Sequence, residues 1–335
     1  MRSASEGCLS DDDVACILEG GPRPPRLDAH LDRCEACFSL LAASVCDAQP
    51  TDARDNTARV ANRYELRDVL GEGGMGRVLL AHDTVLGRAV ALKIVRSEVF
   101  GAANLERARD RMKEEARLMA GVTHPNIVHV YDVGEALGGI FIAMEYVPGT
   151  SIDMWVREQD PDEAAVISAF CGAARGLAAA HACGVVHRDV KPSNLLIDET
   201  GHVRVTDFGL ARAIATGDTG SVMSSGHSGT LGYMAPEQAR GGTLSAAVDQ
   251  YSLGLAALGA LVPGAPISVE EVRVALQDVD RPWPEPSFEG APRRLLPILR
   301  RATAHDPSDR YPSIEAFSSL NKAVLCMYIV ECLSL

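Results

Sequence analysis

The sequence predicts an α+β protein with two lobes, preceded by a small helical module. The small lobe is expected to hold a five-stranded antiparallel sheet and one main helix, and the large lobe to be mainly helical. Two observations support this: short apolar runs surround a glycine-rich turn within residues 64–146, whereas alanine-rich and apolar helical stretches dominate residues 164–261. A length of 335 residues is enough for two lobes and a small module, and an apolar content of 47% is typical of a globular protein.

Five runs of strand-forming residues make up the predicted small lobe. They are residues 64–70, 77–82, 90–93, 128–133 and 140–146. Apolar side chains recur at helical spacing in residues 104–121, which predicts an amphipathic helix. The glycine-rich turn at 71–76 continues into a strand and lacks a following Lys-Ser/Thr, which excludes Rossmann and Walker phosphate loops. A glycine-rich hairpin between two strands can still lay its backbone over phosphates.

The sheet is expected to end at Val147-Pro-Gly149, which marks a hinge between the lobes. Backbone groups of Glu145 and Val147 could hydrogen-bond an adenine edge, with Met144 behind it. Beyond the hinge, the alanine-rich segment 164–183 and the nearly all-apolar segment 248–261 predict two helices of the large lobe.

A short hairpin in the large lobe gathers polar side chains. Apolar runs at 195–197 and 203–205 flank a four-residue turn, which predicts a tight pair of strands. Asp189 and Asn194 precede the first strand, and Asp207 follows the second. Two acids and an amide at one end of a hairpin make an oxygen-rich site suited to Mg²⁺ held through phosphates, and one acid is left to accept a proton.

Several separated motifs follow one another along the chain. They include Gly71-Glu-Gly-Gly-Met-Gly76, Val90-Ala-Leu-Lys93, His187-Arg-Asp189, Asp207-Phe-Gly and Ala235-Pro-Glu237. Through these motifs, residues 64–322 resemble a bacterial eukaryotic-like Ser/Thr protein kinase. Lys191 and Gly229-Thr230 resemble the Ser/Thr branch rather than the Tyr branch. The resemblance implies transfer of the γ-phosphate of ATP to Ser/Thr hydroxyls of protein substrates, including the chain's own activation loop.

The resemblance also implies an ATP site. Lys93 would hold the α- and β-phosphates, and Glu115 would orient Lys93. Glu114 is rejected because it lies about 100° around the helix axis. The other positions that would contact ATP are Leu70, Gly71, Gly73, Gly76, Val78, Ala91, Met144, Glu145 and Val147.

In the large lobe, the resemblance implies the catalytic groups. Asp189 would orient the substrate hydroxyl and accept its proton, and Lys191 would neutralise the γ-phosphate. Asn194 and Asp207 would hold Mg²⁺ or Mn²⁺. Phosphoryl transfer needs little covalent chemistry, so positioning and charge placement provide most of the catalysis. The alternative is a kinase-fold signalling scaffold that acts through its N-terminal module with little catalysis.

A polar, glycine-punctuated segment between Asp207 and Glu237 resembles an activation loop. Arg188, beside the catalytic acid, implies control by phosphorylation, because a phosphate would gain a charge-assisted pair there. Thr230 is expected to contact Asp189 and help seat the acceptor hydroxyl. The candidate phosphorylation sites are Thr219, Ser221, Ser224 and Ser225. An unmodified, solvated linker is the alternative.

Two further positions resemble structural residues of the same family. Glu237 would pair with Arg310 inside the large lobe, and Asp249 would hold the backbone of the catalytic loop. Residues 263–292 lack the family's usual Pro-Phe, which leaves the local geometry of substrate docking open.

Residues 1–46 predict a small helical module with helices at 11–18 and 27–45. Such a unit has little core and would gain stability from a metal. A regulatory protein is an expected partner of this module. Residues 47–62 are polar and predict a flexible linker to the small lobe, which is expected to span 63–147.

A zinc site is the specific hypothesis for this module. His30, Cys34 and Cys37 fall on one face of a helix, so an imidazole and two thiolates could converge on Zn²⁺, with Cys8 as the fourth ligand. The pattern resembles a zinc-binding anti-sigma-type domain over residues 8–46. Apolar thiols that fill a helical hairpin are the alternative.

Charge and composition limit the remaining possibilities. A net charge of −13 argues against broad binding of nucleic acid or anionic membranes, although a local basic patch is not excluded. No secretion signal is recognised, and nine cysteines suit reduced thiols, so a cytoplasmic location is expected. The large lobe is expected to span 148–323, and the apolar tail 324–335 to pack on it as a helix, with a weak membrane or partner contact as the alternative. A homodimer is an alternative to a monomer.

Overall fold

The computed structural model describes most of the chain between residues 59 and 316. The described ranges are 59–73, 76–95, 105–136, 139–208, 231–262, 264, 266–278 and 281–316, without the side chains of 105–109 and 111. The chain divides into two compact units. The first holds residues up to Ala116 together with Val130–Tyr146, and the second holds Arg117–His129 together with the chain from Val147 onward.

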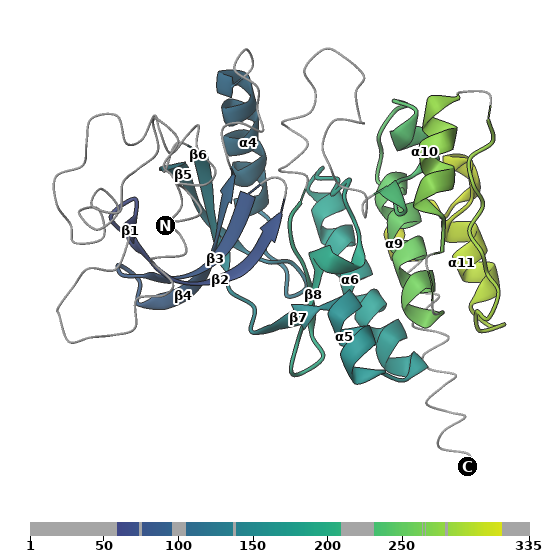
Figure 1. Ribbon diagram of the computed structural model, residues 1–335, viewed down its shortest axis with the longest axis horizontal. Helices are drawn as coiled ribbons and strands as arrows, with labels where there is room; N and C mark the ends of the chain where they lie inside the picture. The colour runs from purple at the N-terminus through teal and green to yellow at the C-terminus, as the bar shows by residue number, and fades with distance from the viewer. Residues whose placement is uncertain are drawn as a thin grey trace, which may run out of the picture. The chain divides into compact units, whose positions relative to one another are not determined.

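The first unit is built on a six-stranded antiparallel sheet with the order β1-β2-β3-β4-β6-β5 (Figure 1). Its strands are β1 (Arg59–Val60), β2 (Tyr64–Gly73), β3 (Gly76–Asp83), β4 (Arg88–Val95), β5 (Val130–Ala136) and β6 (Gly139–Glu145). The five predicted strands correspond to β2–β6, but the predicted strand number is one too small. β1 forms inside the segment predicted as a flexible linker, because buried Val60 pairs with Tyr64 and joins the apolar core.

One face of this sheet packs into a core of its own. Side chains of alternate residues on neighbouring strands share a face of a sheet. Val90, Leu92 and Ile94 of β4 accordingly join Phe141 and Ala143 of β6 in one buried cluster. The intervening residues of β4, Ala91 and Lys93, therefore face the opposite side.

Helix α4 (Leu105–Ala120), which belongs to the first unit up to Ala116, matches the predicted amphipathic helix at 104–121. Met112, Ala116 and Met119 are buried, at the spacing of one helical face. Lys113 forms an ion pair with Glu135 of β5, which fixes the helix beside that strand.

The second unit is mainly helical. Its helices are α5 (Ile152–Gln159), α6 (Glu163–Ala182), α8 (Pro236–Ala239), α9 (Ala247–Leu261), α10 (Val269–Gln277) and α11 (Leu296–Ala302). The predictions at 164–183 and 248–261 are confirmed by α6 and α9, both of which are buried over most of their length. Among the described helices, α6 alone has the length and hydropathy of a membrane span, and 67% of its most apolar window is buried within the protein.

A small three-stranded sheet lies in the second unit, with the order β7-β8-β9. The predicted hairpin is confirmed as β8 (Leu195–Asp198) and β9 (Val203–Val205). β7 (Gly149–Ser151) pairs with β8 and was not predicted. A Cβ at Gly149 would lie 2.1 Å from the carbonyl oxygen of Ile197, so only glycine allows this pairing.

A buried ion pair ties together distant parts of the second unit. The guanidinium of Arg310, which is 2% exposed as a residue, donates to both carboxylate oxygens of Glu237 at 2.6 and 2.9 Å. It also donates to the carbonyl oxygens of Ala247, Ala304 and His305. The predicted Glu237–Arg310 pair is confirmed.

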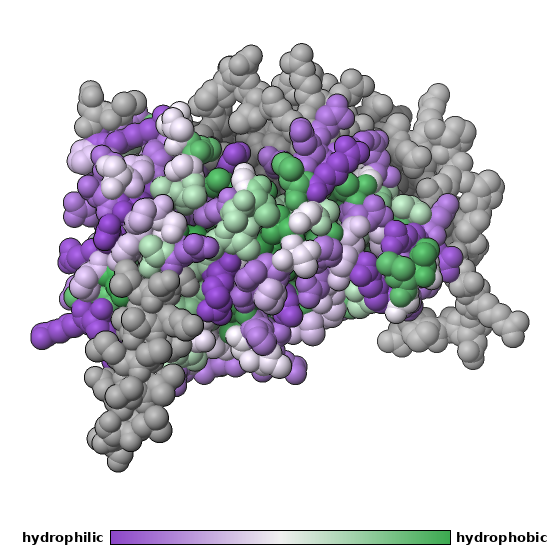
Figure 2. All heavy atoms as spheres, turned by 180° about the vertical axis from the view of Figure 1, so that it is seen from behind, coloured by the Kyte–Doolittle hydropathy of each residue, from purple (hydrophilic) through white to green (hydrophobic). Residues whose placement is uncertain are grey.

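The surface drawn in Figure 2 carries hydrophilic and hydrophobic residues side by side. Within the described residues, the exposed large apolar side chains are Val69, Leu70, Val85, Leu86 and Leu118. Four of them form two adjacent pairs, and exposure of a few apolar residues is normal for a folded protein.

Candidate active site

The loop that precedes β8 is held by a buried carboxylate. Asp249 of α9 is 0% exposed and accepts hydrogen bonds from the backbone N–H groups of His187 at 2.8 Å and Arg188 at 2.7 Å. Its Oδ2 also lies 2.7 Å from Nε2 of His181. Hydrogen bonds to a charged acceptor are stronger than neutral ones. Asp249 therefore fixes the loop, as predicted.

His187 connects this loop to the segment after β9. Its Nε2 lies 2.8 Å from the carbonyl oxygen of Thr206, and its Nδ1 accepts the backbone N–H of Asp189 at 3.2 Å. Its ring packs on Phe208, with centroids 4.5 Å apart. These contacts place the backbone of Asp189 next to the segment that carries Asp207.

Two non-glycine residues adopt left-handed backbone conformations at the site. Arg188 has φ of 66° and Asp207 has φ of 60°. Such conformations cost free energy and persist where the surroundings enforce them, frequently at functional sites. At Arg188, the surroundings include the hydrogen bond from its backbone to Asp249 and one from Gln238 to its carbonyl oxygen.

Three side chains converge at the start of β8. Nδ2 of Asn194 donates to the backbone oxygen of Asp189 at 2.8 Å and to its Oδ2 at 3.2 Å. Nζ of Lys191 lies 3.0 Å from the same Oδ2. The other oxygen, Oδ1, is buried and has no hydrogen-bond partner in the described part of the chain. Within the described residues, no donor therefore competes with a substrate hydroxyl group for Oδ1 of Asp189.

The oxygen donors needed for a hard cation lie on adjoining backbone segments. The N–H of Thr206 donates to the carbonyl oxygen of Asn194 at 3.0 Å, which brings Asn194 close in the backbone to Asp207. Because Nδ2 of Asn194 is already used, its Oδ1 is the atom left for a ligand. An amide oxygen and a carboxylate fit Mg²⁺, which completes its shell with phosphate oxygens and water. The described residues contain no cluster of three or more His, Cys, Asp or Glu that could hold a metal.

Asn126 supports the β8–β9 hairpin, a role that the sequence reasoning missed. Its Nδ2 donates to the carbonyl oxygen of Val203 at 2.7 Å, and its own carbonyl accepts from Val205 at 2.9 Å. Its N–H donates to Nδ1 of His124 at 3.1 Å, and burial, together with the charge of Arg175, lowers the pKa of His124 so that this nitrogen can accept. The signal in the sequence was a polar residue between Pro125 and an apolar run.

In the first unit, four predicted nucleotide contacts share one face of the sheet. Lys93 lies opposite Val78 of β3, and Ala91 lies opposite Met144 of β6. Directly opposed residues of antiparallel strands project to the same side, and Ala91 and Lys93 are two residues apart on one strand. Val78, Ala91, Lys93 and Met144 therefore form a common surface opposite the apolar core.

The glycine-rich turn has one position that requires glycine. Gly76 has φ of 151°, and a Cβ there would lie 1.8 Å from the carbonyl oxygen of Ile94. Gly71 and Gly73 have nothing within 4 Å of an added Cβ, and both are exposed, as is Leu70. This open surface can admit a ligand close to the backbone.

Comparison with known proteins agrees with this geometry. Residues 64–319 match the family described as protein kinase domain. The chain belongs to the protein kinase family. Over 264 residues the kinase is 36% identical to the serine/threonine-protein kinase PrkC of Bacillus subtilis, and over 267 residues 38% identical to PknB of Mycobacterium tuberculosis. These matches cover 77% and 76% of this chain, which spans about 40% of the length of either relative.

Solved structures agree with these relatives. The kinase domain of PknI from M. tuberculosis aligns with a TM-score of 0.63 and 27% identity, and the alignment covers 81% of this chain and 98% of that one. The fold is therefore the protein kinase fold, with a β-rich small lobe and a helical large lobe.

The structure of this kinase describes some of the predicted site residues and leaves others outside the described ranges. Asp189, Lys191 and Asn194 are in contact with one another. Glu115 is partly buried on α4, whereas Glu114 is exposed. This difference favours Glu115 over Glu114 as the partner of Lys93. Glu145 ends β6, and buried Val147 begins the second unit.

Other predictions fall outside the described residues. These are the zinc ligands Cys8, His30, Cys34 and Cys37, the phosphorylation sites Thr219, Ser221, Ser224 and Ser225, the contact of Thr230 with Asp189, the helices predicted at 11–18 and 27–45, and the tail 324–335.

Proposed function

We propose that this chain is a protein Ser/Thr kinase that transfers the γ-phosphate of ATP to Ser/Thr hydroxyls of proteins and autophosphorylates its activation loop. The observation that supports this most strongly is the buried Oδ1 of Asp189, which has no partner in the described chain while Lys191 and Asn194 occupy the other oxygen. A carboxylate in that state can accept a proton from an incoming hydroxyl group.

The large lobe supplies the transfer chemistry in this proposal. Asp189 orients the acceptor hydroxyl and removes its proton, while Lys191 offsets negative charge on the transferred phosphoryl group. Asn194 and Asp207 hold Mg²⁺ or Mn²⁺, which when bound neutralises phosphate charge. Asp249 acts through the loop backbone and is a positioning residue.

The small lobe supplies the nucleotide site. Val78, Ala91 and Met144 offer an apolar surface for adenine, and Lys93, on the same face, is a cation for the α- and β-phosphates. Glu115 orients Lys93, and the backbone at Leu70, Gly71, Gly73 and Gly76 covers the phosphates. Glu145 and Val147 hydrogen-bond the adenine edge.

Regulation is part of the same proposal. Thr219, Ser221, Ser224 and Ser225 are the expected phosphorylation sites, and Thr230 is expected beside Asp189. Residues 1–46 are proposed to bind a regulatory protein in the cytoplasm, with a homodimer as a second mode of assembly. Elemental analysis of the wild type against a Cys34→Ala/Cys37→Ala variant tests the zinc ligands, and equal zinc contents would refute them.

The test of activity uses the purified full chain with ATP labelled in the γ-phosphate and Mg²⁺. The wild type should label itself or a generic protein acceptor, and hydrolysed product should contain phosphoserine or phosphothreonine. Asp207→Asn should label far less, because it loses a ligand of the cation. An unlabelled wild-type protein and acceptor would favour the signalling scaffold instead.

A further inference from the structure

Gln238 of α8 is a buried glutamine that contacts the loop carrying Asp189. It is 3% exposed, and its Nε2 donates to the carbonyl oxygen of Arg188 at 2.8 Å. Its Oε1 is buried as well and has no hydrogen-bond partner among the described residues. Within that part of the chain, the hydrogen bond to Arg188 is therefore the contact that accounts for an amide at this position.

The backbone of Arg188 is held between two side chains. Its φ of 66° is a left-handed conformation, which costs free energy in a residue other than glycine. The φ and ψ angles of a residue are the rotations between its two flanking peptide groups, because each peptide group is itself planar. Asp249 accepts the N–H of the first group at 2.7 Å, and Gln238 donates to the C=O of the second. Together these two contacts restrain both backbone angles of Arg188.

The peptide group that Gln238 binds ends at the proposed catalytic acid. Its C=O belongs to Arg188 and its N–H to Asp189, and this N–H donates to Nδ1 of His187 at 3.2 Å. Of the two hydrogen bonds on this group, the one from Gln238 is the shorter. A rotation of the group would move the Cα–Cβ bond of Asp189, and the carboxylate would move with it. Gln238 therefore acts on the direction of that carboxylate through the backbone.

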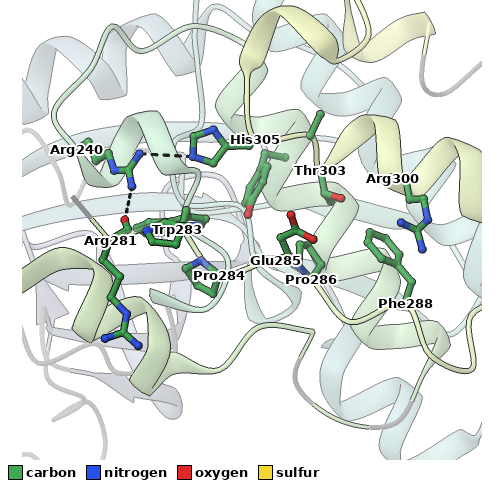
Figure 3. Close-up of a pocket in the computed structure, with 13 residues that line it drawn as sticks. Arg240, Arg281, Trp283, Pro284, Glu285, Pro286, Phe288, Arg300, Thr303 and His305 are labelled. Carbon is green, nitrogen blue, oxygen red and sulfur yellow. Dashed lines mark hydrogen bonds between the residues drawn. The ribbon is translucent and has the colours of Figure 1, made fainter. Parts of the chain in front are cut away.

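The short helix α8 is anchored on both sides of Gln238. Before it, the carboxylate of Glu237 binds the buried guanidinium of Arg310 at 2.6 and 2.9 Å. After it, Nη2 of Arg240 donates to the carbonyl oxygen of Arg281 at 2.9 Å (Figure 3). Gln238 therefore projects from a fixed element, which a side chain needs in order to position another group.

Glutamine suits this place better than a charged or an apolar side chain. A carboxylate at 238 would put an oxygen against the carbonyl oxygen of Arg188, and leucine would leave that oxygen without its donor. The amide also has a cost, because its Oε1 is buried without a partner in the described chain. Leucine would remove one hydrogen bond and one unpaired acceptor together, so the stability of the fold should change little.

We propose that Gln238 is a positioning residue for phosphoryl transfer, which sets the backbone of Arg188 and thereby the direction of the Asp189 carboxylate. The inference rests on the proposed kinase activity. It adds to that activity a residue that acts through the loop backbone and touches neither ATP nor the acceptor hydroxyl. Loss of the amide should therefore slow phosphoryl transfer and leave the binding of ATP unchanged.

The test compares two buried glutamines of the second unit in the full chain. Gln238→Leu is matched to Gln250→Leu, because Gln250 is 1% exposed and its amide also holds backbone groups. Its Oε1 accepts the N–H of Tyr311 at 2.9 Å, and its Nε2 donates to the carbonyl oxygen of Tyr311 at 3.2 Å. Each variant is assayed for kcat of protein phosphorylation, for the Kd of ATP with Mg²⁺ by calorimetry, and for its midpoint of urea unfolding.

The two leucine variants should rank in opposite order for activity and for stability. Gln238→Leu should lower kcat on the order of tenfold to a hundredfold, because a small misplacement of a catalytic group slows the reaction strongly. Its Kd for ATP and its unfolding midpoint should stay close to those of the wild type. Gln250→Leu should unfold at a lower urea concentration, because it loses two hydrogen bonds, and should keep the wild-type kcat.

A conservative variant completes the test. Gln238→His keeps an N–H donor on Nε2 and should recover part of the kcat that Gln238→Leu loses. A wild-type kcat in Gln238→Leu, or an equal fall of kcat in both leucine variants, would overturn the proposal. An inactive wild-type chain would instead refute the kinase activity on which the inference rests.

Discussion

The two hairpins that carry the proposed site are held in different ways. Two buried side chains that lie far away in the sequence hold the β8–β9 hairpin and its preceding loop: Asn126 donates a hydrogen bond to Val203, and Asp249 accepts one from the backbone N–H of His187. The β2–β3 hairpin is exposed from Arg67 to Gly73, and its pairing contains two register shifts. Buried polar contacts thus fix the loop that carries the proposed catalytic groups. The turn expected to cover the phosphates consists of solvent-exposed backbone instead.

The largest effect is expected from Asp249→Ala. This substitution removes a buried carboxylate that accepts hydrogen bonds from the backbone N–H groups of His187 and Arg188. The ring of His181 would lose its contact with the same carboxylate. Each such loss costs about 1–3 kcal/mol, so the free energy of unfolding should fall by about 3 kcal/mol or more. Urea unfolding measures this loss. Asp153→Ala, an exposed acid on α5, is the control, and a loss no greater than that of the control would show that the loop does not depend on Asp249.

A smaller effect is expected from Gly176→Ala in α6. The added Cβ would lie 2.4 Å from the carbonyl oxygen of Asn126, the group that accepts from Val205 of β9. Overpacking a close contact typically costs about 1–3 kcal/mol, and a shift of Asn126 should also disturb β9. Thermal unfolding together with the rate of phosphoryl transfer would show both effects. Unchanged stability would mean that the hairpin tolerates displacement of its support.

The far end of the β2–β3 hairpin provides a pH test. Asp83, at the end of β3, is 0% exposed and accepts from Nε and Nη2 of Arg63 at 2.8 and 2.7 Å. The hydrogen bond from Arg63 lowers the pKa of Asp83 to about 2. A lowered folded-state pKa gives stability that is present above the unfolded value of about 3.9 and is lost as the pH falls toward 2.

The measurement is the difference in unfolding free energy between wild type and Asp83→Asn from pH 6 to pH 2. This difference should stay constant above about pH 4 and shrink below it. A difference independent of pH would indicate that the ion pair with Arg63 does not contribute.

The smallest effect on stability is expected at the glycine-rich turn itself. Gly71→Ala places a Cβ where no atom lies within 4 Å, so the free energy of unfolding should change by about 0.5 kcal/mol or less. The KM for ATP should rise, because the methyl group would occupy space over the phosphates. A large loss of stability with an unchanged KM would contradict the account, because the exposed turn would then support the fold and not the binding of ATP.

The sequence predicted the helices and strands that have a clear local pattern and the residue roles that follow from recognisable motifs. The β8–β9 hairpin followed from two short apolar runs that flank a turn, α4 from helical periodicity, and α6 and α9 from their alanine-rich and nearly all-apolar composition. The roles of Asp249 and of the Glu237–Arg310 pair came from family resemblance and are confirmed by their hydrogen bonds.

Features that arise only from tertiary pairing were not predictable in the same way. β1 and β7 have two and three residues, too few to show a period, and each forms only against a longer strand. Asn126 acts across 77 residues on Val203, and no local pattern indicates such a partner. The pocket lined by Arg240, Tyr251, Trp283 and His305 (Figure 3) likewise gathers residues from four separate segments.

The most direct test of the central claim separates nucleotide binding from phosphoryl transfer in Asp189→Asn. If Asp189 accepts the proton of the hydroxyl group, kcat for protein phosphorylation should fall by roughly 10²–10⁴, the usual range for a general base. The Kd for ATP with Mg²⁺, measured by calorimetry, should stay unchanged, because Asp189 is proposed to contact the acceptor rather than the nucleotide. Phosphorylation at the wild-type rate by Asp189→Asn would contradict the account.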